Sequence, residues 1–140
     1  MIDTKVDYTI FFRELSNIPH NLSSLEKSFY GKQQNENIKL RWNSWLENWK
    51  VKINVNDEES KQKLSNQMKL INPKYTLREW HLVWAYKEAE KGNYKPIKEL
   101  QEIMTNPYSE QTKEIEEKYY TKKPKDFFGI AGISHVSCSS

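Results

Sequence analysis

The sequence has little of several things on which many protein classes depend. It contains one cysteine, four glycines and five prolines in 140 residues. A single cysteine excludes an internal disulfide framework, and four scattered glycines cannot form a glycine-rich phosphate-binding loop. No apolar run approaches the roughly 20 residues that a membrane-spanning helix needs, so we expect no membrane partner. The first nine residues, MIDTKVDYT, lack the basic and apolar regions of a signal peptide.

The sequence also lacks a large excess of charge of either sign. The net charge is +3, with acidic and basic residues interspersed along the chain. A value this small does not by itself indicate nucleic-acid binding, and we expect no nucleic-acid partner. The one cysteine and the lack of a signal peptide favour a reducing compartment, so we expect a cytoplasmic location, or a mitochondrial one if the source is a eukaryote.

Aromatic residues are abundant, and the apolar pattern is helical almost throughout. Five Trp, eight Tyr and five Phe can supply much of a core. The pattern predicts an all-α fold, a bundle of five to seven helices with an extended C-terminal tail. We expect the bundle to occupy residues 1–121 and the tail, which carries Cys138, to occupy residues 122–140.

Several helix ends can be predicted from local signals. Asp3 or Thr4 is expected to cap the first helix, and Thr76 a later one through a capping box with Glu79. Gly92 is a typical helix stop, and Pro96 suits the first turn of the next helix.

Hydrophobic periodicity predicts which side chains are buried. The segment at residues 38–53 places six apolar residues on one face, and the next helix is expected to bury three. The residues are Ile38, Trp42, Trp45, Leu46, Trp49 and Ile53 in the first segment, and Leu64, Met68 and Ile71 in the second.

Catalytic and metal-binding residues are hard to find. The three histidines have no metal-binding spacing, and His135 with Cys138 supplies only two ligands. His81 lies on an apolar helix face, which favours a hydrogen-bonded core histidine over a general base. The tryptophan stripe favours a core over a platform for stacking bases. We therefore predict no catalytic, cofactor-binding or metal-binding residue in this chain, and expect the chain alone to be inactive.

Cys138 is the remaining candidate. It lies three residues from the end of the sequence, among small polar residues, where a thiol would be accessible. A functional thiol also needs a lowered pKa, and His135 is the one nearby candidate for a cationic neighbour. From the residues alone, an incidental thiol is slightly favoured.

Five blocks of the sequence, taken in order, resemble the C-terminal region of the selenoprotein O family. They are DYTIFFRELS, WNSWLENW, MKLINPKYTLREWHL, AEKGNYKPIKELQEIMTNPY and the terminal VSCSS. The resemblance implies a longer protein with a kinase-like (pseudokinase) domain that binds ATP and magnesium and transfers AMP to protein hydroxyl groups. It also implies a redox role for Cys138, because some family members carry selenocysteine there. The thiol would pair with a cysteine outside this chain.

Two interpretations follow from the resemblance. In the first, the chain is an excised or separately encoded C-terminal helical domain that braces the kinase-like domain, on the same or a separate chain, and presents Cys138 as a redox thiol. Protein substrates would be those of the full-length enzyme. In the second, it is a free-standing helical interaction module without an enzymatic role. An exposed apolar docking surface would favour the first interpretation.

Overall fold

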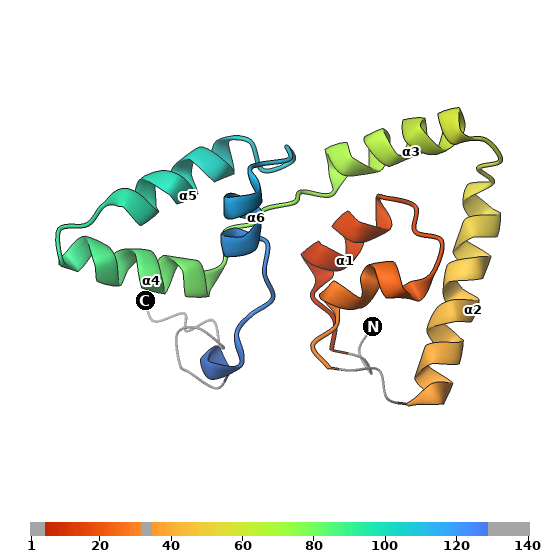
Figure 1. The fold of residues 1–140 in the computed structure, drawn as a ribbon, viewed down its shortest axis with the longest axis horizontal. Coiled ribbons are helices and arrows are strands. Elements are labelled where there is room, and N and C mark those ends of the chain that lie inside the picture. The colour runs from red at the N-terminus through yellow and green to blue at the C-terminus, as the bar shows by residue number, and fades with distance from the viewer. Residues whose placement is uncertain (1–4, 32–34, 129–140) are drawn as a thin grey trace, which may run out of the picture. The chain divides into compact units, whose positions relative to one another are not determined.

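A computed structural model describes residues 5–31 and 35–128 of the chain (Figure 1). This part contains six α-helices, two 3-10 helices and no strand, and one isolated antiparallel bridge joins Val6 to Phe29. The all-α prediction is therefore confirmed. In chain order the elements are α1 (Tyr8–Leu15), η1 (Leu22–Ser28), α2 (Glu36–Ile53), α3 (Glu58–Ile71), α4 (Glu79–Glu90), α5 (Lys95–Thr105), α6 (Lys113–Tyr119) and η2 (Lys125–Phe127).

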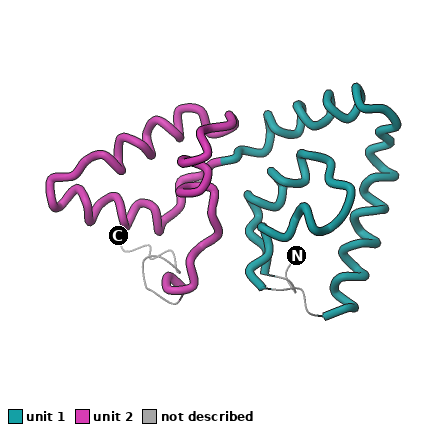
Figure 2. Tube along the Cα trace, viewed as in Figure 1, with its two compact units in different colours: residues 1–74 teal, residues 75–140 magenta. Residues whose placement is uncertain are grey.

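The chain divides into two compact units, residues 1–74 and residues 75–140 (Figure 2). The first contains α1, η1, α2 and α3, and the second contains α4, α5, α6 and η2. The boundary after residue 121, which the sequence placed between bundle and tail, stays a prediction. Cys138 and His135 lie outside the described residues.

Helix α1 begins later than the sequence predicted. Its N-cap is Asp7, not Asp3 or Thr4, and the Asp7 carboxylate accepts a hydrogen bond from the Ile10 amide at 3.1 Å. The second carboxylate oxygen of Asp7 accepts a hydrogen bond from the Tyr30 hydroxyl at 3.1 Å. Asp7 is preferred because one side chain both satisfies a free amide of the first turn and fixes the start of α1 to a distant segment.

Aromatic rings form the core of the first unit. The Phe11 side chain is fully buried, and its ring centroid lies 5.3 Å from that of Trp42, which in turn lies 5.3 Å from Phe29. Such tilted and edge-to-face pairs are favourable beyond the area that they bury. The buried members of this core are Phe11, Leu15, Leu25, Phe29, Trp42 and Leu46.

Helix α2 confirms the predicted segment but buries less of the predicted face. Trp42 and Leu46 are buried, whereas Trp45 is 38% exposed. The Trp45 ring lies parallel to that of Trp49, with centroids 6.4 Å apart. The apolar face of α2 is thus buried at Trp42 and Leu46 and partly exposed at Trp45.

Helix α3 is held to α1 by its C-terminal end. The buried guanidinium of Arg13 donates from Nη1 to the carbonyl oxygens of Lys69 and Asn72, at 3.1 and 3.0 Å. The Asn72 side chain donates to the Ser16 hydroxyl at 3.1 Å. Met68 packs against the core, but the predicted burial of Ile71 is wrong, because its side chain is exposed.

In the second unit, α4 and α5 form an antiparallel hairpin (Figure 1). The predicted Thr76 cap is wrong: α4 begins at Glu79, with Arg78 at the N-cap position and no side-chain capping bond. Gly92 does occupy the left-handed region after α4, with φ +85°, and Pro96 lies in the first turn of α5. These two signals succeed because they act directly on backbone dihedrals.

The burial difference between Phe11 and Trp45 gives a stability prediction. Phe11→Ala should lower the free energy of unfolding by about 3–5 kcal/mol, since it empties the centre of an aromatic core. Trp45→Ala should cost about 1–2 kcal/mol, because much of its ring already contacts water. Urea unfolding followed by circular dichroism measures both, and equal costs would contradict the core described here.

Candidate functional site

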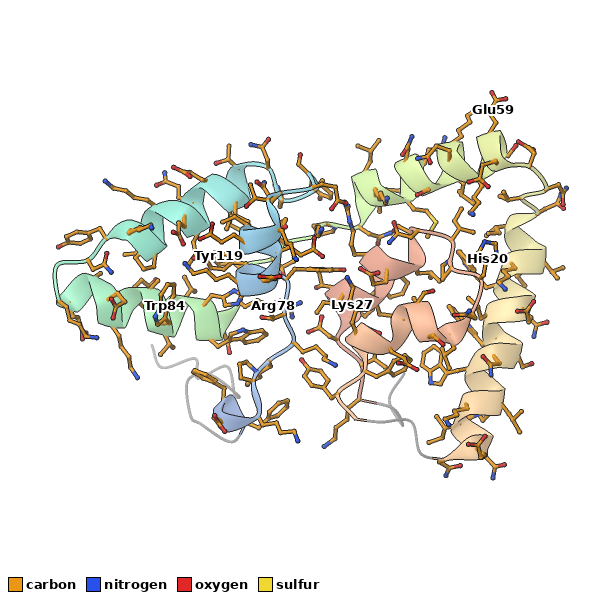
Figure 3. The ribbon with its side chains drawn as sticks, in the orientation of Figure 1. His20, Lys27, Glu59, Arg78, Trp84 and Tyr119 are labelled. Atoms are coloured by element: carbon orange, nitrogen blue, oxygen red, sulfur yellow. The ribbon has the colours of Figure 1, made fainter. Side chains whose placement is uncertain are left out.

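The second unit gathers charged and aromatic side chains from three helices at one place. We call this group the His81 cluster, and three of its members, Arg78, Trp84 and Tyr119, are labelled in Figure 3. Arg78 precedes α4, His81 and Trp84 lie on α4, Glu99 lies on α5, and Lys118 with Tyr119 ends α6. Thr112 caps α6 through a bond from the Ile115 amide to its hydroxyl, which sets where the last turn of that helix falls.

Glu99 is the polar centre of the His81 cluster. Its carboxylate accepts a hydrogen bond from the Tyr119 hydroxyl at 2.8 Å and forms a hydrogen-bonded ion pair with Lys118. Lys95 lies 3.8 Å away on the same helix. The bond from Lys118 lowers the pKa of Glu99, while burial and the neighbouring Glu99 raise the pKa of Tyr119. At neutral pH the carboxylate is therefore ionised and the phenol is neutral.

His81 is buried, as the sequence predicted. Its ring lies edge-on to those of Tyr119 and Trp80, at 5.2 and 5.4 Å. Burial, together with the nearby charges of Arg78 and Lys118, lowers the pKa of His81 from 6.5 to about 4. The imidazole is therefore neutral at physiological pH.

The cations of the His81 cluster lie over aromatic rings. Lys118 Nζ is 4.7 Å from the centroid of the Trp84 ring and 5.0 Å from that of Tyr119. The Arg78 guanidinium lies 5.2 Å from the Trp80 ring. All three contacts are favourable cation–π interactions.

This arrangement acts as a clamp between helices. The carboxylate of Glu99 and the hydroxyl of Tyr119 already satisfy each other, so they join α5 to α6. The shifted pKa values of Glu99, Tyr119 and His81 follow from burial and ion pairing between the helices, because structural contacts shift pKa values as active sites do. No signal in the sequence pointed to Glu99, Lys118 or Tyr119, because pairs 19 and 20 residues apart leave no local pattern.

Cofactor and membrane requirements can be tested only on part of the chain. Within residues 5–31 and 35–128, no three His, Cys, Asp or Glu side chains come together as a metal site would require. The helices of that same part are too short or too polar to cross a bilayer. Cys138, the one predicted redox residue, falls beyond the described residues, so its surroundings stay a prediction.

Comparison with known proteins assigns the family. A family model described as protein adenylyltransferase SelO matches residues 1–105. The chain belongs to the SelO family. A protein nucleotidyltransferase YdiU of Flavobacterium johnsoniae is 32% identical over 147 residues, which cover 98% of this chain and 27% of that relative. One from Tolumonas auensis is 32% identical over 139 residues, covering 97% of this chain and 26% of the relative.

The SelO relatives are much longer than this chain. The chain spans about a quarter of the length of the curated relatives that it matches. No solved structure matches it. The family that the sequence blocks indicated is therefore confirmed, whereas the activity printed in the relatives' names belongs to proteins about four times as long.

The lowered pKa of His81 predicts acid sensitivity. The unfolded chain binds a proton near pH 6.5 and the folded chain only near pH 4, so stability is complete above pH 6.5 and falls as the pH drops. Between pH 6.5 and 5 the free energy of unfolding should fall by about 1.5 kcal/mol. Urea unfolding at several pH values measures this slope.

A matched control separates His81 from the other histidine that the structure describes. His81→Gln should flatten the slope between pH 6.5 and 5, whereas the same change at exposed His20 should leave it intact. If the slope persisted in His81→Gln, the protonation cost would lie elsewhere.

Proposed function

We propose that this chain is the C-terminal helical region of a SelO-like protein adenylyltransferase, which as a whole transfers AMP from ATP to protein hydroxyl groups. One observation carries the proposal: the chain matches the family over residues 1–105 while covering only about a quarter of relatives named protein nucleotidyltransferases. The terminal block VSCSS supports the C-terminal placement through the resemblance described above.

The proposed role of the chain is to brace the catalytic part of the protein. We propose that the catalytic, ATP-binding and magnesium-binding groups lie in the kinase-like part, as the family resemblance described above implies. The exposed apolar side chains of α3 and α4 support a bracing role, because such surface is costly to leave in water. We propose a cytoplasmic location for the whole protein.

The proposed role of Cys138 is thiol–disulfide exchange. The chain holds one cysteine, so its partner would come from the rest of the protein or from another protein. In the exchange, the Cys138 thiolate attacks one sulfur of an existing disulfide, a new S–S bond forms, and the other sulfur leaves as a thiolate. No net electrons are consumed, because one disulfide replaces another.

Transplantation tests the proposed function. In a chimera, this chain replaces the matched segment of the Flavobacterium johnsoniae relative. We expect both the chimera and its parent to transfer AMP from radiolabelled ATP to a protein substrate. The isolated chain should show no transfer with ATP and either magnesium or manganese. An active isolated chain would overturn the assignment of catalysis to the kinase-like part, and an inactive chimera beside an active parent would overturn the family role.

Cys138→Ser tests the redox role separately. In the isolated chain the change should shift the melting temperature by no more than about 1 °C, because a residue near the chain end is not expected to be core. In the oxidised chimera, mass mapping should find the Cys138 peptide joined to a second cysteine, and this species should disappear in Cys138→Ser. A Cys138 thiol that stays reduced throughout would exclude the exchange.

A further inference from the structure

Two aliphatic residues that are neighbours in sequence are largely exposed at the last turn of α3. Leu70 is 73% exposed and Ile71 is 75% exposed, and we call them the α3 patch. Scattered exposed apolar residues are ordinary on protein surfaces. Burying each of these side chains would contribute about 1.5–3 kcal/mol, so binding of a partner that covers both would be favourable.

Ile71, one of the two residues of the α3 patch, continues a stripe that faces the core, whereas Leu70 lies about 100° away around the helix. Leu64, Met68 and Ile71 follow the spacing of one helix face. Met68 packs against the aromatic core, whereas Ile71, one turn further on, does not. The stripe is therefore longer than the surface that the first unit offers to cover it.

The α3 patch is also rigidly held. Arg13 binds the carbonyl oxygens of Lys69 and Asn72, the residues that flank the patch on either side. The Asn72 side chain bonds Ser16 and the Met68 carbonyl, both within 3.1 Å. A fixed backbone presents its side chains with little loss of entropy on binding, which favours a docking role.

The charge around the α3 patch indicates the chemistry of a partner. From Ser60 to Ile71 the helix carries three lysines and no acidic residue, and of the three lysines Lys69 adjoins the patch. Lys61 pairs with Glu58 in the preceding turn, at 3.6 Å. A surface that fits this end of α3 would present an apolar centre with an acidic rim, since like charges opposite the lysines would be repelled.

We propose that the α3 patch is the surface through which this region docks against the remaining part of the SelO-family protein. The length of that protein supports this occupant: the chain covers 26–27% of its relatives, so about three-quarters of the family protein is available to cover the patch. The inference rests on the proposed function and deepens it, because it names the face that does the bracing.

The chimera described above provides the test. The measurement is amide hydrogen exchange over residues 60–72, in the chimera and in the isolated chain. Docking should slow exchange of the α3 amides at least about ten-fold in the chimera, and Leu70→Ser with Ile71→Ser should remove that protection. The same double variant in the isolated chain should keep its melting temperature within about 2 °C, because the patch is already exposed there.

A matched control lies on α2 in the same unit. Leu40 and Val51 are 64% and 76% exposed, but they are three turns apart and form no pair. Leu40→Ser with Val51→Ser should leave the exchange of α3 unchanged in the chimera. Equal exchange in the α3 and α2 variants would overturn the docking proposal.

Two further outcomes would show that the α3 patch is covered by something other than the rest of the protein. A large loss of melting temperature in the isolated α3 variant would mean that another segment of this chain covers the patch. Sedimentation of the isolated chain as a dimer that the α3 variant breaks would assign the patch to a second copy. Either result would overturn the proposal. An unprotected patch in a chimera that transfers AMP would remove the docking inference alone, whereas a chimera without AMP transfer would remove the proposed function.

Discussion

Arg13 carries a permanent charge into the interior of the first unit, and the position of α3 depends on how that charge is satisfied. A buried guanidinium without acceptors would be strongly destabilising. The carbonyl oxygens of Lys69 and Asn72 are acceptors at the end of a helix, where backbone carbonyls lack partners and the helix dipole is negative. One side chain therefore meets two needs, and in doing so fixes the last turn of α3, with Leu70 and Ile71, to α1.

The sequence predicted the helices well where a local signal acts on the backbone. Gly92 and Pro96 restrict or permit particular dihedrals whatever surrounds them, and both mark helix ends in the structure. Side-chain caps were less predictable, because Asp3, Thr4 and Asp7 offer the same chemistry. Asp7 differs in its contacts with a distant segment, among them the Tyr30 hydroxyl, which is 23 residues away and bonds the same carboxylate. The predicted cap at Thr76 was also wrong, because α4 begins at Glu79 and has no side-chain cap.

Periodicity identified which side chains share a face, but not how far that face is covered. The stripe of α2 is core at Trp42 and half-exposed at Trp45, and the stripe of α3 is covered at Met68 and open at Ile71. How much of a helix face is buried depends on the neighbouring element, and the apolar pattern of one helix carries no information about that neighbour. The His81 cluster was invisible for the same reason, because Glu99 meets Tyr119 only once α5 and α6 are placed. Cys138 was singled out by its position and by family resemblance, and its role stays a prediction.

The polar groups of the described residues are largely used in holding the helices together. The Arg13 guanidinium binds helix carbonyl oxygens, and the Glu99 carboxylate binds Lys118 and Tyr119. Burial keeps His81 neutral. Groups committed in this way are poor candidates for proton transfer or phosphate binding, because a substrate would have to displace their partners. Leu70 and Ile71, at the end of α3, are the most exposed aliphatic neighbours in sequence among the residues that the structure describes. This exposed apolar surface is the observation behind our proposal that the region binds the rest of a larger protein.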